Sequence, residues 1–377
     1  MLLLMAAPLT VRSQSGSTLP CTERETHVSR IPTASTEIFC LERVVELNNA
    51  PEMSFTALAT FPDGRLFTIS PTAGTLIEIT DTNDDAVPDT PIILAEALER
   101  PASLTAYQDA LYITGGSMVY RWTEDGGLET LVSDLPSGTG YWNGGIAVGG
   151  IEESERLYVG VGARCDLCDE ALNDTEHGVI LSFALDGSDR QLIATGFRHP
   201  SGLMWYQESL WVTDVSPQQL STGRYDELNR INLSSLGDIP DYGAPFCLAG
   251  STAIGSHNCD GTIPPVLTFS SGSNPIALTP YQGTAFTPYD GYLTIAFSGT
   301  AHASRMRGYT LEFVWPEGDT ALTVVPAFPD RDQQYGGVGF YPHHVYGTAL
   351  SPEGWIYIST GGGSIYVVRP VQPDPKR

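Results

Sequence analysis

Residues 201–231, SGLMWYQESLWVTDVSPQQLSTGRYDELNRI, contain three short β-type runs separated by turns. The first two runs, 202–206 and 209–213, are rich in aromatic and β-branched residues, which predicts two strands. The second run leads into Asp214, and a loop rich in Gln, Ser and Gly connects it to the third run. Because sheet proteins keep their chemistry at strand ends, an acid here belongs either to a site or to a solvated turn.

This order of strand, turn, strand and third strand occurs six times along the chain. In the early copies the apolar anchors of the second strands are roughly 45 residues apart, a period typical of propeller blades. No segment shows a sustained helical period. The sequence therefore predicts an all-β fold, a six-bladed β-propeller formed by residues 37–370. The anchors are Leu66, Leu111, Leu157, Leu210, Leu293 and Ile356.

The last copy stops after three strands, whereas the run FCLERVVELN, 39–48, has no repeat of its own. We expect this N-terminal strand to supply the outer strand of the last blade, because that closes the ring and hides a sheet edge. The preceding residues 1–36 are interpreted as a signal segment and linker, and residues 371–377 as a C-terminal tail.

The composition limits the function classes. The chain has 377 residues, 41% of them hydrophobic, so it can form a large core. Its formal net charge is −25 with only 19 Lys and Arg, which argues against nucleic acids and anionic membrane surfaces, since both require a basic face. The apolar start, MLLLMAAPLT, resembles a secretion signal too short to span a bilayer, although a frayed apolar end is the alternative.

Six cysteines fall in three close pairs, Cys21/Cys40, Cys165/Cys168 and Cys247/Cys259. Export would make these pairs disulfides. The Cys165-x-x-Cys168 pair would alternatively be half of a zinc site or a redox motif, but no second CxxC and no thioredoxin-like pattern accompany it. The sequence therefore predicts a secreted or periplasmic protein without a membrane span in its mature form.

In a propeller, the loops that enter the innermost strands form one rim of the central channel. Charged and aromatic groups on these loops converge there and define the default pocket. In this sequence the loops precede Gly144, Gly202, Thr284 and Gly347, and they carry Tyr141-Trp142-Asn143, Arg198-His199, Asn274-Pro275 and His343-His344.

Several strings follow one another along the chain: LYVGVGARCDLCDE, ILSFALDGSDRQLIATGFRHPSGLMW, LWVTDV with DELNRI, DYGAPFC and AFSGTAHASRMRGYTL. In this order they resemble the sequences of the quinoprotein glucose/sorbosone dehydrogenases. The resemblance is greatest to the sorbosone dehydrogenase-like branch, and it covers residues 54–370. These are six-bladed propellers that use pyrroloquinoline quinone (PQQ) and calcium. The resemblance implies that a base takes the proton of a substrate hydroxyl while hydride moves to the quinone.

Site residues follow from the resemblance position by position. Arg198 matches the arginine beside cofactor and substrate, and His199 stands where the family usually has Asn. Asp214 matches an acidic position that, with the backbone carbonyls of Ser216 and Pro217, would hold calcium. The acidic pair matches Asp226 and Glu227, and metal support and loop anchoring are both open for it.

Other positions depart from the family pattern. The general-base histidine belongs just before 146–148, where Tyr141 or, with a one-residue slip, Trp142 stands. An indole cannot accept a proton, and a phenol with a pKa of about 10 is a poor base. By their positions in the family pattern, we assign Tyr141 and Arg198 as the catalytic positions. On the same basis, the cofactor-binding positions are Trp142, Arg198, His199 and His344.

The basic groups expected for a tricarboxylate cofactor are also partly missing. Ala303 and Thr310 stand where the family often has basic residues, and His344 stands where an arginine is common. The candidate replacement anchors are Arg305, Arg307, His343 and His344.

A second calcium candidate precedes the second repeat. Oxygen side chains at alternate positions, with one backbone carbonyl, are typical of the start of an EF-type loop, although the turn glycine and the closing Glu are absent. An acidic surface turn is the alternative, and a calcium ion here would have a structural role. The five positions are Asp81, Asn83, Asp85, Val87 and Asp89.

Three functions are open. The first is an exported PQQ- and calcium-dependent dehydrogenase that oxidises a sugar or a related alcohol or aldehyde and passes electrons to an unidentified acceptor. The second is a non-catalytic propeller that binds a ligand or a protein, since the general-base histidine is absent. The third is a calcium-dependent hydrolase or lactonase, which would need several Asn, Asp or Glu side chains in the channel, where only Asp214 is placed.

Overall fold

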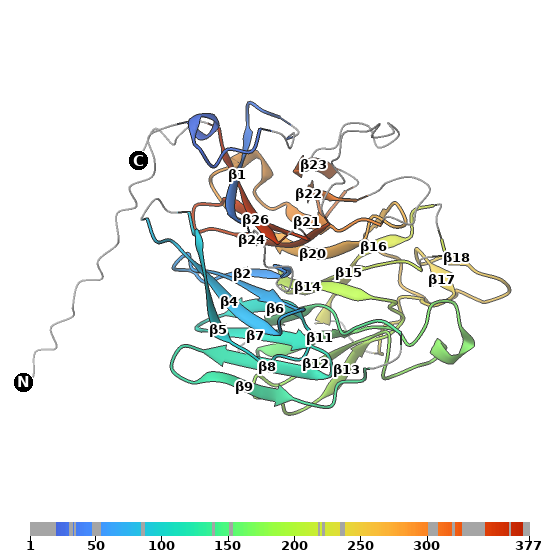
Figure 1. Ribbon diagram of the computed structural model, residues 1–377. Helices are drawn as coiled ribbons and strands as arrows, with labels where there is room; N and C mark the ends of the chain where they lie inside the picture. Colours follow the sequence, from blue (N-terminus) through green and yellow to red (C-terminus); the bar gives the residue numbers. More distant parts are fainter. Residues whose placement is uncertain are drawn as a thin grey trace, which may run out of the picture.

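The computed structural model describes residues 20–29, 33, 35–46, 54–83, 87–137, 140–150, 154–217, 219–220, 223–233, 238–300, 308–318, 321–325, 344–361 and 363–371. In this part of the chain, six four-stranded antiparallel sheets surround a common centre and form a six-bladed β-propeller, as expected (Figure 1). A small hairpin of β17 (Cys247–Leu248) and β18 (Thr252–Ala253) lies in the connection between two strands of the fourth blade.

The four strands of each blade follow one another from the centre of the ring to its periphery. The first blade is β2 (Leu58–Thr60), β3 (Leu66–Ser70), β4 (Thr75–Thr80), β5 (Thr90–Ala95), and the second is β6 (Pro101–Tyr107), β7 (Ala110–Gly115), β8 (Met118–Thr123), β9 (Gly127–Val132). The third is β10 (Ile146–Gly149), β11 (Arg156–Val161), β12 (Val179–Phe183), β13 (Gln191–Ala194), and the fourth is β14 (Pro200–Tyr206), β15 (Ser209–Asp214), β16 (Asp226–Ile231), β19 (Leu267–Phe269). The fifth is β20 (Pro275–Pro280), β21 (Leu293–Phe297), β22 (Thr310–Val314), β23 (Ala321–Val325), and the sixth is β24 (Val345–Leu350), β25 (Ile356–Thr360), β26 (Ser364–Pro370), β1 (Phe39–Glu46).

The N-terminal strand closes the ring, as expected. Strand β1 is antiparallel to β26, with Phe39 opposite Pro370, and Figure 1 shows the blue strand beside the red one. Part of the segment assigned to the linker is attached to it: Cys21 forms a disulfide with Cys40, and Arg24 contacts the buried Glu42 at 2.8 Å. The last blade is therefore fastened to both ends of the described chain.

The core is divided among the six interfaces between neighbouring blades. Each of six apolar clusters combines residues of two consecutive blades, and the cluster between the sixth and first blades includes Tyr357 and Leu66. The six anchors that define the repeat are all fully buried. Since each inter-blade contact buries one face of two sheets, closing the ring buries the apolar faces of the first and last blades as well.

The fifth blade differs from the sequence prediction. Its inner strand is β20, whereas the sequence pattern predicts that this strand begins at Thr284, in the run 284–286. This run instead leads into a 3₁₀ helix, η4 (Thr287–Tyr289), and Phe286 packs into the core between the fifth and sixth blades. The backbone N–H of Phe286 donates to the Tyr281 hydroxyl at 2.8 Å. Its apolar character therefore reflects packing on a buried tyrosine rather than pairing in a sheet.

All three expected cysteine pairs are disulfides, including Cys247–Cys259 beside β17 (Cys247–Leu248) and β18 (Thr252–Ala253), and Cys165–Cys168 before the 3₁₀ helix η2 (Asp169–Ala171). A further 3₁₀ helix, η1 (Cys21–Glu23), contains the first cysteine. Among the described residues, no helix has the length and apolar character needed to cross a bilayer.

Candidate functional site in the central channel

The inner strands of all six blades line a central channel with a cavity of about 1120 Å³. Because these strands run in the same direction around the ring, the residues at their starts meet at one mouth. Most of the predicted rim groups converge there, but Asn143 and Pro275 do not line the cavity, and His343 lies outside the described residues. The converging groups are Tyr141, Trp142, Arg198, His199, Asn274 and His344.

The lining of this cavity has a charge opposite to that of the whole chain. The described residues that line it include Arg100, Arg198, His199 and His344, but no Asp or Glu. In a protein with a net charge of −25, this selection places the guanidinium groups of Arg100 and Arg198, and no carboxylate, among the described residues that line the mouth. The cavity is therefore suited to an anionic ligand.

Arg198 is the most tightly held of these groups. Its side chain is only 3% exposed, its Nε donates to Asp166 Oδ1 at 2.7 Å, and its Nη1 donates to the Val215 carbonyl at 3.2 Å. The guanidinium carbon lies 3.7 Å from the centre of the Tyr141 ring, a cation–π contact. Its Nη2 is buried and has no hydrogen-bond partner among the described residues. A fixed guanidinium thus keeps one donor nitrogen for a ligand.

Asp214 holds the backbone of the Arg198–His199 turn. Its two carboxylate oxygens accept the backbone N–H groups of Arg198, at 2.9 Å, and His199, at 2.6 Å. Burial raises the pKa of Asp214 to about 6. Strand β15 therefore ends in a carboxylate that orients the turn, and Asp214 does not itself line the cavity.

The two acids that begin β16 hold neighbouring loops in the same way. Asp226 accepts the backbone N–H groups of Ser216, at 3.0 Å, and Asn274, at 2.8 Å. Glu227 lies opposite Asp214 in the sheet, and it accepts the N–H of Ala249 at 2.9 Å and, through its other oxygen, the Asn229 amide. Burial, and then the charge of Asp214, raise the pKa of Glu227 to about 8. Of the two roles considered for this acidic pair, metal support and loop anchoring, these contacts correspond to loop anchoring.

The oxygens expected to hold calcium near the channel do not fit that ion as they are arranged. All six carboxylate oxygens of Asp214, Asp226 and Glu227 accept protein N–H or O–H groups. The Pro217 carbonyl accepts the N–H of Leu220, and both donors of Ser216 point to Asp226. Calcium requires six to eight oxygens turned to one point, so we derive no step through calcium at this site.

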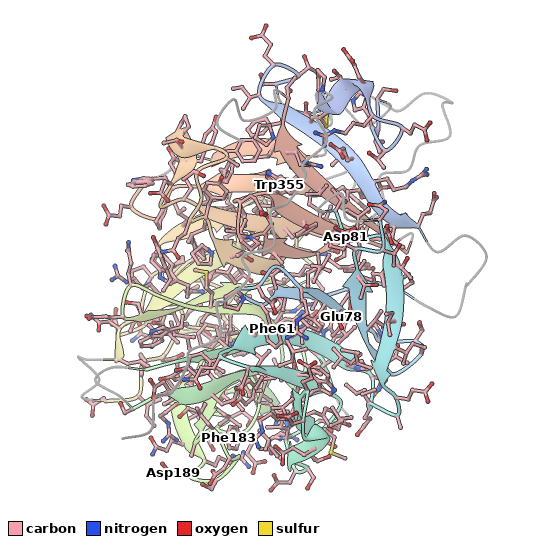
Figure 2. The ribbon with its side chains drawn as sticks, turned by 90° about the vertical axis from the view of Figure 1, so that its left-hand side faces the viewer. Phe61, Glu78, Asp81, Phe183, Asp189 and Trp355 are labelled. Atoms are coloured by element: carbon pink, nitrogen blue, oxygen red, sulfur yellow. A yellow bond between two sulfur atoms is a disulfide. The ribbon has the colours of Figure 1, made fainter. Side chains whose placement is uncertain are left out.

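The second calcium candidate lies in the loop between β4 and β5, within the first blade, and Figure 2 shows Asp81 near the outer side of the molecule. Asp81 accepts the backbone N–H of Asn83 at 3.2 Å, and Asp89 accepts the Thr82 hydroxyl at 2.7 Å. Asp85 lies outside the described residues, and Val87 is buried. The loop is remote from the channel, and a structural calcium ion in it stays a proposal.

Tyr141, at the position of the expected base, acts as a hydrogen-bond donor. Its hydroxyl donates to Asp166 Oδ1 at 2.6 Å. Burial, and then this hydrogen bond, raise the pKa of Tyr141 to about 12. The phenol therefore keeps its proton at neutral pH and cannot serve as a general base.

Aromatic rings form one wall of the mouth. Trp142 is 63% exposed, and its ring meets that of His199 edge to face at 4.4 Å between centroids. His199 stacks on Tyr141 at 5.7 Å. Burial, and then the charge of Arg198, lower the pKa of His199 to about 3, so its imidazole is neutral. Its buried Nε2 has no partner among the described residues and is available to a ligand.

His344 stands at the start of β24 on the opposite side of the mouth. Its Nδ1 lies 2.8 Å from the Ser298 carbonyl oxygen, and its ring faces those of Tyr309, at 4.9 Å, and Tyr346, at 5.9 Å. The other replacement anchors, Arg305 and Arg307, lie outside the described residues.

Asp166 is the functional residue that sequence reasoning missed. One of its oxygens accepts both the Tyr141 hydroxyl and the Arg198 Nε, so it joins two of the expected site residues. It lies between Cys165 and Cys168, in the tight loop that their disulfide closes after β11. The available sequence signal for Asp166 was an acidic residue between the two cysteines of a Cys-x-x-Cys pair that follows a strand.

Comparison with known proteins supports the fold. No family model matches the sequence, and no curated protein matches it. The holo PQQ domain of pyranose dehydrogenase from Coprinopsis cinerea has a TM-score of 0.74 at 12% identity, over 90% of this chain and 97% of that one. A calcium structure of the Trichoderma reesei carbohydrate-active enzyme family AA12 has a TM-score of 0.70 at 17% identity, over 91% and 98%.

The PQQ-bound aldose sugar dehydrogenase of Streptomyces coelicolor has a TM-score of 0.60 at 18% identity, over 89% of this chain and 99% of that one. Two of these neighbours are named as sugar dehydrogenases with PQQ, and this chain shares the fold of all three over almost its whole length. This agrees with the family resemblance of the sequence, while the sorbosone dehydrogenase-like branch is not distinguished from the others.

Proposed function

We propose that this protein binds a PQQ-type quinone at the channel mouth and is a dehydrogenase of a sugar or a related alcohol or aldehyde. One observation carries the proposal: a cavity without acidic side chains among its described residues surrounds a buried guanidinium whose Nη2 has no partner. A planar tricarboxylate needs cations at its edge and flat rings against its faces, and the mouth supplies both.

The residues that would hold this group are Arg198, His199 and Trp142, with Arg100 as a second guanidinium at the rim, while His344 faces them across the mouth. When bound, the quinone supplies an acceptor for a hydride. Asp166 fixes the guanidinium of Arg198, and the exposed Trp142 offers a flat apolar face at the entrance. Calcium enters this proposal only as a condition to be tested.

The alternative is a propeller that binds the same kind of ligand without turnover, and the hydrogen bond of Tyr141 favours it. The position of the expected base is occupied by a phenol that donates to Asp166. The hydrolase or lactonase interpretation has less support, because Asp214 is turned to the backbone and no acid lines the described cavity.

Export is part of the proposal. Three disulfides are typical of an oxidising compartment, which agrees with secretion or a periplasmic location. The expected signal segment, residues 1–19, lies outside the described residues.

The test is a titration of the metal-free protein with PQQ, with and without calcium, followed by absorbance and then by dye-linked oxidation of aldoses and sorbosone. Saturable uptake with turnover supports the dehydrogenase, and uptake without turnover supports the binding alternative. Arg198→Gln should weaken uptake at least tenfold. The control is Arg156→Gln, which removes the same charge from a surface pair with Asp189. No uptake by the unaltered protein would exclude both functions.

A further inference from the structure

The site has a proton donor where a proton acceptor is expected. Oxidation of an alcohol requires a group that accepts the hydroxyl proton within the cavity. Tyr141 donates to Asp166, and the Asp166 oxygen that accepts it is also occupied by Arg198. His199 has a free Nε2, but burial and the neighbouring guanidinium lower its pKa to about 3, which makes it a weak base.

His344 has its tautomer set by the backbone. A carbonyl oxygen can only accept a hydrogen bond, and the Ser298 carbonyl lies 2.8 Å from Nδ1. Nδ1 must therefore carry the proton, and the neutral imidazole then has its lone pair on Nε2. The main chain at His344 is also held in place, because the Gly361 N–H donates to the His344 carbonyl at 2.8 Å.

The surroundings of this imidazole leave Nε2 available. His344 lines the channel and is half-buried, and no described residue forms a hydrogen bond with its Nε2. The groups that face the ring are the phenols of Tyr309 and Tyr346, and Ser298, whose hydroxyl lies 3.4 Å from Nδ1. An oriented lone pair is therefore presented at the mouth.

We propose that His344 is the general base of this site and accepts the substrate's hydroxyl proton at Nε2. The inference rests on the proposed function. The O–H and C–H bonds of the carbinol break and a C=O bond forms. The proton moves to Nε2, and a bound quinone, as the oxidant, would accept the hydride with both electrons. The imidazolium that forms keeps its Nδ1–H on the Ser298 carbonyl, whose dipole stabilises the charge.

This assignment moves the base across the ring. Tyr141 precedes the inner strand of the third blade, and His344 precedes that of the sixth, so the two positions are on opposite sides of a six-bladed channel. A substrate would therefore direct its hydroxyl toward the sixth blade. Tyr141 and Asp166 would keep only the role of holding Arg198.

The decisive variant is His344→Asn, because an Asn side chain can still donate to the Ser298 carbonyl but cannot accept a proton. We expect PQQ uptake within about twofold of the unaltered protein, and kcat lower by about 10²–10⁴-fold with little change in KM. The acidic limb of the pH profile of kcat/KM should disappear, and added imidazole should restore part of the rate. Tyr141→Phe should retain kcat within tenfold together with that limb.

A second readout does not depend on turnover. In ¹⁵N-labelled protein without quinone, the imidazole of His344 should show the tautomer protonated at Nδ1, assigned by its loss in His344→Asn. The control is His27→Gln on the N-terminal segment, which should change neither the spectrum of His344 nor the kinetics.

Three results would overturn the inference. An Nε2-protonated tautomer would remove the lone pair, and unchanged kcat in His344→Asn would show that another group is the base. Loss of PQQ uptake confined to His344→Asn would make His344 a cofactor anchor instead. Failure of the unaltered protein to take up PQQ is a different outcome, because it removes the proposed function and the inference with it.

Discussion

Replacing Asp166 with Asn tests the arrangement of charges at the channel mouth. The substitution keeps the size and shape of the side chain, but it removes the negative charge that lies 2.7 Å from the Nε of Arg198. Arg198 is almost fully buried, so its guanidinium would lose its ionic partner in a place that water reaches poorly. The guanidinium would keep partial compensation from the Val215 carbonyl, the face of Tyr141 and the charge of Asp214.

The magnitude follows from these contacts. Removing one partner of a buried ion pair costs about 3–5 kcal/mol, and a desolvated cation–π contact is worth about 2 kcal/mol, so part of the charge stays compensated. We expect the free energy of unfolding of Asp166→Asn to fall by about 2–4 kcal/mol, measured by urea denaturation followed by fluorescence. Added PQQ should stabilise the variant more than the unaltered protein, because the anion again pairs the guanidinium.

The control for this prediction is Asp189→Asn. Asp189 lies at 2.7 Å from Arg156, but it is largely exposed, and Figure 2 shows it at the periphery of the molecule. A pair screened by water contributes little, so its loss should leave the denaturation midpoint almost unchanged. Equal stability of Asp166→Asn and the unaltered protein, or equal stabilisation of both by PQQ, would refute the reasoning.

Three further predictions address other parts of the molecule. The pKa of Glu227 in the folded protein, about 8, lies above its ordinary 4.5, so the free energy of unfolding falls as pH rises through that interval. Glu227→Gln should remove this fall, which is on the order of 4 kcal/mol between about pH 5 and pH 8, as measured by urea denaturation. Parallel pH dependence in the variant and the unaltered protein would contradict the prediction. Cys21→Ser removes the disulfide between the N-terminal segment and β1, and it should lower the free energy of unfolding by about 3 kcal/mol in thermal denaturation. An unchanged midpoint would show that strand pairing alone closes the ring. Trp142→Ala should change stability by less than about 0.5 kcal/mol yet weaken PQQ binding several-fold by absorbance titration, and equal affinity would remove this ring from the site.

The fold could be predicted because its stabilising contacts repeat. Each blade buries the same anchor position against its neighbour, so Leu66 and its five counterparts record the six interfaces in the sequence. The incomplete last copy and the unmatched run around Phe39 then predict the closure. The fifth blade was misassigned because Phe286 is buried by a tyrosine in a loop, and an apolar run alone does not distinguish the two environments.

The site could be predicted only in part. Arg198 and His199 precede an inner strand, so their position at the mouth follows from the repeat. The partners of Asp214 and Glu227 do not, because backbone N–H groups of distant turns have no sequence signal. The pairing of Asp166 with Tyr141 arises within the third blade, because the antiparallel pairing of β10 with β11 brings the loop before β10 next to the loop after β11.

The central claim is that the channel mouth is an anion site built around Arg198, and it is tested most directly by equilibrium dialysis of the purified protein against PQQ at two ionic strengths. The account predicts one quinone per chain, bound more weakly at high salt and with an affinity lowered at least tenfold by Arg198→Gln but not by Arg156→Gln. Absence of binding, or binding that is indifferent to both salt and Arg198→Gln, would contradict it.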